Sequence, residues 1–342
     1  MKNKGLGCLV IFLVVALVAS VGLNFLQLGT FFIGGLDEGG ISFVRPKDKF
    51  SEVLEQDGVN KSTEKIVQID MTGIIASGPA GDIFSSGGMS VGGIKRALEQ
   101  AVADKNVRAI VLKVNTPGGE VTASDTLYHA VKQAAAKKPV VVYMDSMAAS
   151  GGYYLACGAT KIVANETTLT GSIGVIIQTL NYSQTFDKVG LQTMTFASGA
   201  FKDSLSGSRP MRDDEKAYIQ NLVTQMYDKF LGIVSEARGI DAATLKDGIA
   251  DGRVLTGKEA LDKKLVDQVG YVEDAYALAK QLGKSPNAMV VRYQHTPSLS
   301  DIFGALGQSQ ASAGTVKIDV SDRLLPRLEA GRMYLLPSHM VP

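Results

Sequence analysis

Apolar runs and amphipathic segments alternate along the chain from residue 66 to about residue 283. The apolar runs are short and rich in β-branched residues, which is typical of strands, and the amphipathic segments repeat their apolar residues at helical spacing. Strands that alternate with helices in this way form largely parallel sheets, because each helix carries the chain back across the sheet. The sequence therefore predicts an α/β fold built from repeated strand–helix units.

The expected elements follow one another in a regular order. We expect strands at residues 66–76, 107–115, 139–144, 161–165, 172–177 and 191–197. We expect helices at residues 90–104, 123–136, 152–159, 183–190 and 213–237. The last helix is long and charged, and its apolar face comprises Ile219, Leu222, Val223, Met226 and Phe230. A short strand, a helix and a turn at residues 251–270 close the domain.

The N-terminus has the pattern of a membrane anchor. Lys2 and Lys4 are followed by no charge until Asp37, and the apolar stretch from Leu6 to Leu28 is long enough to cross a bilayer. Basic residues before such a span place the N-terminus in the cytoplasm and the rest of the chain outside. We therefore expect a single-pass anchor in the cell membrane and an extracytoplasmic domain. The alternative is a cleaved signal peptide, for which residues 18–20 form a weak cleavage site.

Composition changes at both ends of the alternating region. The stretch before it is rich in glycine and charge, which is typical of a tether, and the pattern fades again after about Arg292. The predicted organisation is an anchor at residues 1–30, a tether at 31–64, a folded domain at 65–292, and a linker with a C-terminal tail at 293–342.

Charge and cysteine content exclude several classes of protein. The 35 basic residues balance the 34 acidic ones, so nothing attracts the chain as a whole to nucleic acid. Two cysteines do not make a disulfide framework. Three scattered histidines and no cluster of Cys and His argue against a zinc site. We therefore expect no metal, no cofactor and no nucleic-acid partner.

The stretch "MDSMAASGGYYLACGA" at residues 144–159 places Ser150 between an apolar run and a helix-like one. This setting resembles the strand-to-helix bend on which hydrolases expose a nucleophilic serine. Backbone N–H groups at the start of the helix, such as that of Gly151, suit a developing oxyanion. The alternative is that these small residues only let the helix pack closely on the strand.

The stretch "NTPGGE" at residues 115–120 ends another expected strand. A bare backbone at Gly118 and Gly119 can approach a ligand and donate an N–H group to it, although Pro-Gly is also an ordinary turn signal. Ligands bind outside the carboxyl ends of strands in α/β sheets. Two neighbouring strand ends would then set these glycines opposite Ser150.

The stretch "FASGAFKDSLS" at residues 196–206 carries Lys202 among apolar neighbours. A lysine acts as a general base only when it is neutral, which requires burial to lower its pKa from about 10.4. The alternative is a surface lysine, which is the usual place for this residue. Ser172, in "TGSIGV", could orient the amine by a hydrogen bond or could be an ordinary turn serine.

Five motifs in this order resemble the signal peptide peptidase A family, in its short single-domain form. They are "VNTPGGEVTASD", "MAASGGYYLA", "TGSIGVI", "ASGAFKD" and "GRVLTGKEALDKKLVDQVG". The resemblance runs from about Ile66 to Gly283 and implies a ClpP/crotonase-like fold and a membrane-bound serine protease with a serine–lysine dyad.

Carried over motif by motif, the resemblance assigns a role to each candidate residue. Ser150 is the nucleophile, Lys202 is the general base, and Ser172 positions the lysine. The N–H groups of Gly119 (or Gly118) and Gly151 form the oxyanion hole.

The resemblance also implies ring-like homo-oligomers whose active sites combine neighbouring subunits. The implied substrates are remnant signal peptides and other unfolded polypeptides, cut beside small or aliphatic residues. The tail "GRMYLLP" at residues 331–337 is similar to the C-terminal peptide of short family members and could reach the active site of its own oligomer.

Three rival interpretations stay open. A ClpP-type triad would need a histidine, but His129 precedes Ser150 in a helix-like run and His295 lies beyond the domain. A crotonase-like acyl-CoA enzyme shares the fold but would leave the serine–lysine pair unused. The third is a catalytically inactive, membrane-anchored ring scaffold.

Overall fold

The computed structural model describes residues 20, 50–60, 62–77, 90–294 and 334–335. The expected anchor at residues 1–30 lies outside the described residues, apart from Ser20. Within the described ranges, no helix is both long enough and apolar enough to cross a membrane.

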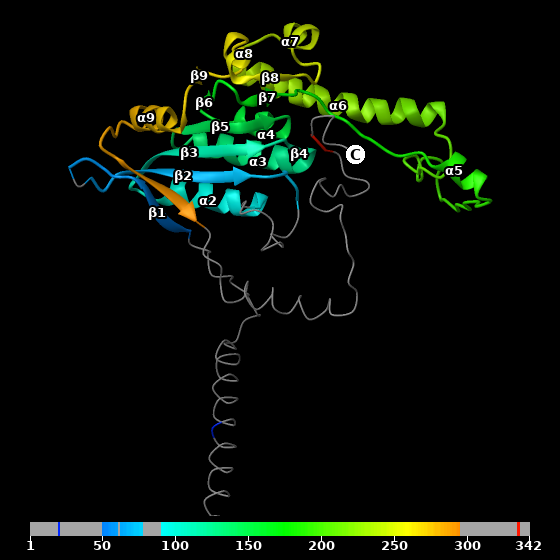
Figure 1. The fold of residues 1–342 in the computed structure, drawn as a ribbon, viewed down its shortest axis with the longest axis horizontal. Coiled ribbons are helices and arrows are strands. Elements are labelled where there is room, and N and C mark those ends of the chain that lie inside the picture. The colour runs from blue at the N-terminus through cyan, green and yellow to red at the C-terminus, as the bar shows by residue number, and fades with distance from the viewer. Residues whose placement is uncertain (1–19, 21–49, 61, 78–89, 295–333, 336–342) are drawn as a thin grey trace, which may run out of the picture. The chain divides into compact units, whose positions relative to one another are not determined.

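A nine-stranded sheet forms the centre of the described fold (Figure 1). Its strands are β1 Ser51–Gln56, β2 Lys65–Thr72, β3 Val107–Thr116, β5 Val140–Ala149, β6 Lys161–Ala164, β7 Leu169–Gly171, β8 Val254–Thr256, β9 Gln268–Val269 and β10 Met289–Gln294. The order is β1-β10-β2-β3-β5-β6-β9, with β7 beside β5 and β8 beside β7. Among the described strands of this sheet, only the β1–β10 and β7–β8 pairs are antiparallel. The predicted α/β fold with a largely parallel sheet is thus confirmed.

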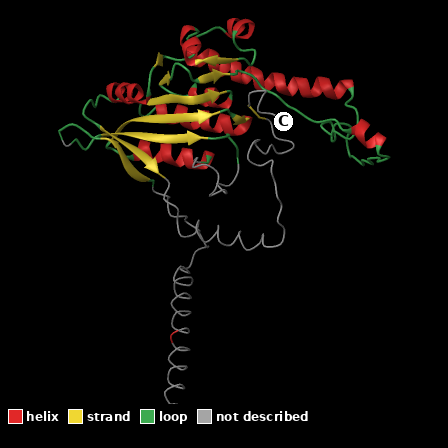
Figure 2. Ribbon diagram, in the orientation of Figure 1, coloured by secondary structure: helices red, strands yellow, loops and turns green. Residues whose placement is uncertain are grey.

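Helices cover both faces of this sheet (Figure 2). The helices of the described residues are α2 Val91–Ala103, α3 Val121–Ala135, α4 Gly151–Ala156, α5 Ser183–Lys188, α6 Asp213–Arg238, α7 Ala242–Gly248, α8 Gly257–Asp262 and α9 Val272–Leu282. Leu112 and Val142 pack with α2, α3 and α4, whereas Val111 and Val141 pack with α9. Successive strand residues point to opposite faces, and both faces are buried, so the central strands read as continuous apolar runs.

The sheet extends into the segment that the sequence assigned to a tether. Strand β1 lies within residues 31–64 and pairs with β10 along the edge of the sheet. Its sequence, SEVLEQ, has two acidic residues and only two apolar ones, so its composition does not mark it as a strand. Edge strands are often charged, because charge discourages pairing with other chains. Arg292 on β10 pairs with Glu55 of β1, with 2.6 Å between Nε and Oε1.

Two predicted strands are wrong. Residues 172–177 follow β7 and form no strand, because the chain turns at Ser172 with a φ of 51°. Residues 191–197 are exposed throughout and belong to no strand. Residues 191–197 have the β-branched and apolar composition of a strand. A strand also needs a neighbouring strand to form hydrogen bonds with its backbone groups.

A projecting arm, residues 177–212, links the sheet to α6 and carries α5. Figure 1 shows α5 beyond the end of α6 that lies away from the sheet. Large apolar side chains are exposed on this arm, including Met194 at 79% and Phe196 at 91%. The apolar face of α6 is buried only near its C-terminal end, where Phe230 packs against Tyr154 with 4.8 Å between ring centroids. The arm therefore presents an apolar surface that the described residues do not cover.

Candidate active site

Ser150 occupies the sharp turn between β5 and α4. Its φ of 52° and ψ of −112° lie in a region that favours glycine. Such a conformation costs of order 1–3 kcal/mol and persists only where the surroundings impose it. Here the constraint is the backbone, because the N–H of Ser150 donates to the Gly171 carbonyl oxygen at 2.8 Å. Its carbonyl oxygen accepts the Tyr154 N–H at 2.8 Å, so backbone hydrogen bonds hold the serine on both sides.

The hydroxyl of Ser150 is buried and unpaired. The residue is 1% exposed, and Oγ has no hydrogen-bond partner among the described residues. Buried hydroxyls almost always have a partner, because an unmade hydrogen bond costs free energy. An orphaned hydroxyl on a strained turn therefore needs a functional explanation.

The Gly118–Gly119 turn lies next to Ser150. The N–H of Gly118 donates to Thr116 Oγ1 at 3.1 Å, so this donor already has a partner. Its carbonyl accepts from Ile75 N, and Glu120 N donates to Ile75 O. Because backbone groups alternate sides along an extended chain, the N–H of Gly119 points away from Ile75. Gly119 is therefore a better oxyanion donor than Gly118.

Gly119 and Gly151 approach each other closely. A Cβ built on Gly151 would lie 3.3 Å from the Gly119 nitrogen and would overlap Ser124 Oγ. Ser124 is itself fixed, since its hydroxyl donates to the Glu120 carbonyl at 2.9 Å. Glycine at 151 thus lets the start of α4 pack against the Gly118–Gly119 turn. Thr116 and Ser124 were not singled out from the sequence, although Thr116 lies inside the "NTPGGE" motif.

Ser172 follows β7 as Ser150 follows β5. Ala149 is paired with Gly171, so the two serines come directly after a matched pair of residues on neighbouring parallel strands. Ser172 is buried, has a φ of 51°, and donates its N–H to the Arg253 carbonyl at 2.8 Å. The sheet register thus places Ser150 and Ser172 at the same edge.

Lys202 lies on the projecting arm and not at this edge of the sheet. It sits in a turn of the projecting arm, where its backbone N–H donates to the Gly199 carbonyl at 3.1 Å and its side chain is exposed. Since Ser150 Oγ has no partner among the described residues, the single chain does not bring Lys202 into hydrogen-bond contact with Ser150. His129 is exposed on α3 and does not contact Ser150 either.

A second segment of chain lies along the Gly119 strand. Strand β11, Tyr334–Leu335, pairs antiparallel with β4, Gly119–Glu120. Leu335 is matched with Gly119, and Tyr334 with Glu120. The edge that holds the candidate oxyanion donor can therefore accept an extended peptide.

Comparison with known proteins identifies the family of the chain. Residues 132–285 match the model of peptidase family S49. A putative signal peptide peptidase SppA of Enterococcus faecium is 36% identical over 282 residues, which is 81% of this chain and 80% of that protein. The chloroplastic serine protease SPPA of Arabidopsis thaliana is 31% identical over 84% of this chain and 47% of its own.

Longer relatives match over a smaller share of their length. Protease 4 of Salmonella typhi is 37% identical over 62% of this chain but only 35% of its own length. The family model matches, and the chain aligns with four fifths of the length of the Enterococcus faecium relative. The family assignment therefore does not rest on one motif. The chain belongs to peptidase family S49, among the signal peptide peptidase A proteins, and is a serine protease.

Proposed function

We propose that the chain cleaves peptide bonds with a serine–lysine dyad, in which Ser150 is the nucleophile and Lys202 is the general base. The observation that carries the proposal is the buried, unpaired hydroxyl of Ser150 on a strained strand-to-helix turn. A nucleophilic serine needs a base to take its proton, and no described residue of the same chain occupies that place.

The proposed reaction is acyl transfer. Neutral Lys202 Nζ accepts the proton of Ser150 Oγ as the oxygen attacks the peptide carbonyl carbon, while the N–H groups of Gly119 and Gly151 donate to the oxyanion. The protonated lysine then gives its proton to the leaving amine. Water, deprotonated by the same lysine, hydrolyses the acyl-enzyme. Ser172 accepts or donates a hydrogen bond at Nζ and so directs the amine toward Ser150.

We further propose that the lysine comes from a second copy of the chain. A lysine amine in water is protonated at neutral pH, so the base must be covered by protein. Lys202 is exposed on an arm whose Met194 and Phe196 are exposed as well. Docking of this arm on a neighbouring copy would bury the apolar side chains and complete the dyad, which favours a ring-like homo-oligomer.

The proposed substrates are extended polypeptides. Pairing of β11 with β4 supports this proposal, because a peptide that adds a strand to this edge would lie beside Gly119. Unfolded chains and remnant signal peptides bind in this way without a defined fold. Residues 1–30 would anchor the enzyme in the cell membrane, with the protease domain of residues 65–292, extended by β1, outside the cytoplasm.

The tail that contains β11 would compete with substrate for this edge. Deleting residues 313–342 should raise the peptidase activity, since β4 would become free. Unchanged activity and unchanged peptide binding after the deletion would remove the tail from the proposal.

A serine-directed covalent probe tests the dyad in the intact protein. Wild type should be labelled, and both Ser150→Ala and Lys202→Ala should lose labelling and peptidase activity while keeping their unfolding midpoint. Lys188→Ala, which removes another exposed lysine of the arm, is the matched control and should behave as wild type. Labelling at the wild-type rate in Lys202→Ala would contradict the base assignment. Absence of labelling and peptidase activity in wild type would favour the inactive scaffold, unless the protein bound coenzyme A.

A further inference from the structure

The proposed base has a carboxylate as its immediate neighbour in the sequence, because Asp203 follows Lys202. A negative charge within about 4–6 Å of an amine stabilises the protonated form. A protonated amine cannot accept a proton from a serine. A serine–lysine mechanism at this position therefore requires that the Asp203 carboxylate be kept away from the lysine.

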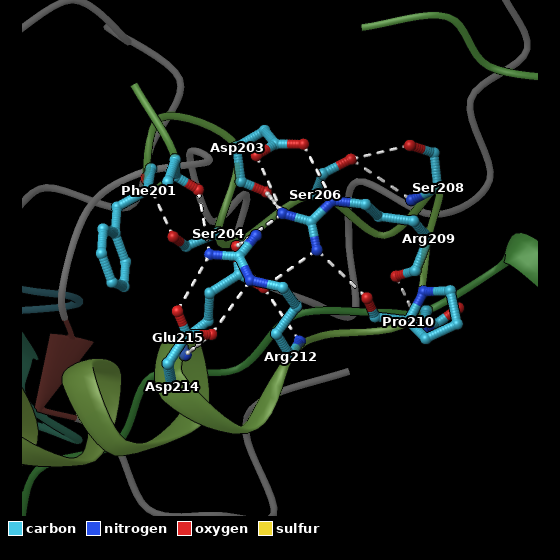
Figure 3. Close-up of polar contacts among 12 residues, drawn as sticks. Phe201, Asp203, Ser204, Ser206, Ser208, Arg209, Pro210, Arg212, Asp214 and Glu215 are labelled. Carbon is cyan, nitrogen blue, oxygen red and sulfur yellow. Dashed lines mark hydrogen bonds and ion pairs between the residues drawn. The ribbon is translucent and has the colours of Figure 1, made fainter. Parts of the chain in front are cut away.

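Arg209 binds that carboxylate in a two-pronged ion pair (Figure 3). Its Nε donates to Asp203 Oδ2 at 2.9 Å, and its Nη2 donates to Oδ1 at 2.8 Å. Both carboxylate oxygens are thus occupied by one guanidinium, in the paired geometry that is the strongest for arginine and carboxylate. Arg209 lowers the pKa of Asp203, so this carboxylate stays ionised and paired at neutral pH.

Glu215 holds Arg209 from the other side. Its Oε2 accepts from Arg209 Nη1 at 2.9 Å and its Oε1 from Nη2 at 2.5 Å. Glu215 is 0% exposed, and it also accepts the backbone N–H of Arg212 at 2.9 Å, where α6 begins. Arg209 lowers the pKa of Glu215 to about 2. The guanidinium is therefore fixed between a buried carboxylate on α6 and the carboxylate beside Lys202.

The loop is also fixed on the other side of Lys202. The ring of Phe201 packs on Tyr218 of α6 with 5.2 Å between centroids, and the Arg212 guanidinium lies 5.7 Å from the Phe201 ring centroid. Arg212 Nη2 donates to the Ala200 carbonyl at 3.1 Å. Residues on both sides of Lys202 are thus bound to the start of α6, while the lysine side chain points into solvent.

The carboxylates around this loop are each paired with a cationic side chain. Two guanidinium groups face three carboxylates, because Arg212 pairs with Asp214 at 3.0 Å as well as with Glu215 at 2.9 Å. The remaining pair on this turn of α6 is Asp213 with Lys216, 2.8 Å apart. Each carboxylate named here has a cationic partner other than Lys202.

We propose that Arg209 is a positioning residue for the base: anchored on Glu215, it withdraws the Asp203 carboxylate from Lys202 and fixes the loop that presents the lysine. The inference rests on the proposed role of Lys202 in the dyad. It assigns to the Asp203–Arg209–Glu215 cluster a function in peptide cleavage that is separate from holding the arm together.

The test is the pH dependence of kcat/KM on a fluorogenic peptide, measured with the full-length assembled protein. In Arg209→Gln the freed Asp203 carboxylate should favour protonated lysine, so the acid limb of the profile should move about one pH unit upward. At a pH on that limb this shift lowers kcat/KM about tenfold. The double variant Arg209→Gln/Asp203→Asn should return the acid limb to its wild-type position.

The test includes a control variant at another arginine and a second pair of variants for the case in which Arg209→Gln does not fold. Arg292→Gln removes an arginine that pairs with Glu55 at the opposite edge of the sheet, and should leave the profile unchanged. Arg209→Gln could fail to fold because Glu215 loses a partner. In that case the double variant Arg209→Gln/Glu215→Gln, which keeps Asp203, is compared with the triple variant that also carries Asp203→Asn. The proposal is overturned if a folded variant that lacks Arg209 but keeps Asp203 has its acid limb at the wild-type pH, whatever its kcat.

Failure of the proposed function gives a different result. Should Lys202→Ala keep its activity, the dyad is wrong and the acid limb does not report on this lysine. Should Lys202→Ala be inactive while removal of Arg209 leaves the acid limb in place, the dyad stands and only the positioning role is lost.

Discussion

Ser150 is tied to the residue before Ser172, because its backbone N–H donates to the Gly171 carbonyl oxygen 2.8 Å away. The two serines have nearly the same φ, 52° and 51°, in a region that non-glycine residues seldom occupy. One hydrogen bond of the sheet thus places two strained, buried hydroxyl-bearing residues at the carboxyl ends of neighbouring strands. Strain of this kind concentrates at functional sites.

Replacing Ser172 with glycine should separate its chemical role from its structural one. Ser172→Gly removes the hydroxyl and suits the positive φ, so the free energy of unfolding should stay level or rise by up to about 1 kcal/mol. If the hydroxyl directs the lysine, kcat/KM should fall about tenfold or more, the equivalent of one lost hydrogen bond. Urea unfolding and peptide kinetics measure both effects.

Ser172→Ala is the control for this experiment. It removes the same hydroxyl but keeps the strain, so it should match Ser172→Gly in activity and unfold at a lower urea concentration. Full activity in both variants would make Ser172 an ordinary turn residue.

Gly151→Ala should damage both stability and activity. The new methyl group would overlap Ser124 Oγ and crowd Gly119, which forces α4 away from the Gly118–Gly119 turn. Overpacking of this kind costs about 1–3 kcal/mol, and the displaced N–H groups would no longer converge on one oxyanion. Urea unfolding and peptidase assays measure the two losses.

Gly232→Ala provides the matched glycine control. Nothing lies within 4 Å of a Cβ at this exposed position of α6, so the free energy of unfolding should rise by about 0.5–1 kcal/mol. Adding Ser124→Ala to Gly151→Ala should recover part of the lost stability, since it removes the overlapping oxygen. No recovery would mean that the overlap is not the cause.

Two inactive variants should restore each other if the dyad forms between copies. Ser150→Ala keeps Lys202, and Lys202→Ala keeps Ser150, so co-assembly at equal amounts should complete about one quarter of the sites of a head-to-tail ring. The measurement is peptidase activity after the two proteins are coexpressed. Coexpression of Ser150→Ala with Ser150→Ala/Lys202→Ala is the control and should give none. Persistent inactivity of the complementary pair in a verified mixed oligomer would place both residues in one copy.

Acid should weaken the fold partly through Glu215. Arg209 lowers the pKa of this carboxyl from 4.5 to about 2. A carboxyl with a lowered native pKa stabilises the fold above its unfolded pKa, and this contribution is lost as pH falls toward the native value. The difference in unfolding free energy between wild type and Glu215→Gln should therefore be constant above about pH 5.5 and shrink between about pH 4.5 and 2. Urea titrations from pH 7 to pH 3 measure it, and a difference that stays constant to pH 3 would contradict the assignment.

The alternation of strands and helices was sufficient to predict β2, β3, β5 and β6 and the helices α2, α3 and α4, but β10 and α9, which covers one face of the sheet, were not predicted. Ser90, where the expected helix at residues 90–104 begins, caps α2 by accepting the Gly93 N–H at 3.1 Å. The edge strand β1 was missed because its pairing with β10 joins residues more than 230 positions apart, and its own charged sequence gives no sign of a partner. The predicted strand at 191–197 has suitable residues but no neighbour.

The candidate site was predictable where it depends on local structure. The bend at Ser150 and the glycine turn at 118–119 lie where the motifs indicate, at the ends of β5 and β3. The hydrogen bond from Gly118 to Thr116 was not predictable, because it depends on a side-chain rotamer. Nor does sequence reveal that Lys202 is exposed on an arm, since its apolar neighbours Phe196 and Phe201 would equally suit a buried pocket. The chemical roles of these residues stay predictions.

Lys202 on the arm does not contact Ser150 of the same copy, and this separation would control when proteolysis occurs. Under the proposal, a newly made chain carries every group that the chemistry needs, yet a solitary copy would be inactive, because no described residue of that copy contacts the hydroxyl of its Ser150. Activity would then appear only when local concentration exceeds the dissociation constant of the assembled form, and dilution alone would silence it. Such an enzyme requires neither an inhibitor nor a removable propeptide to protect the cell that produces it.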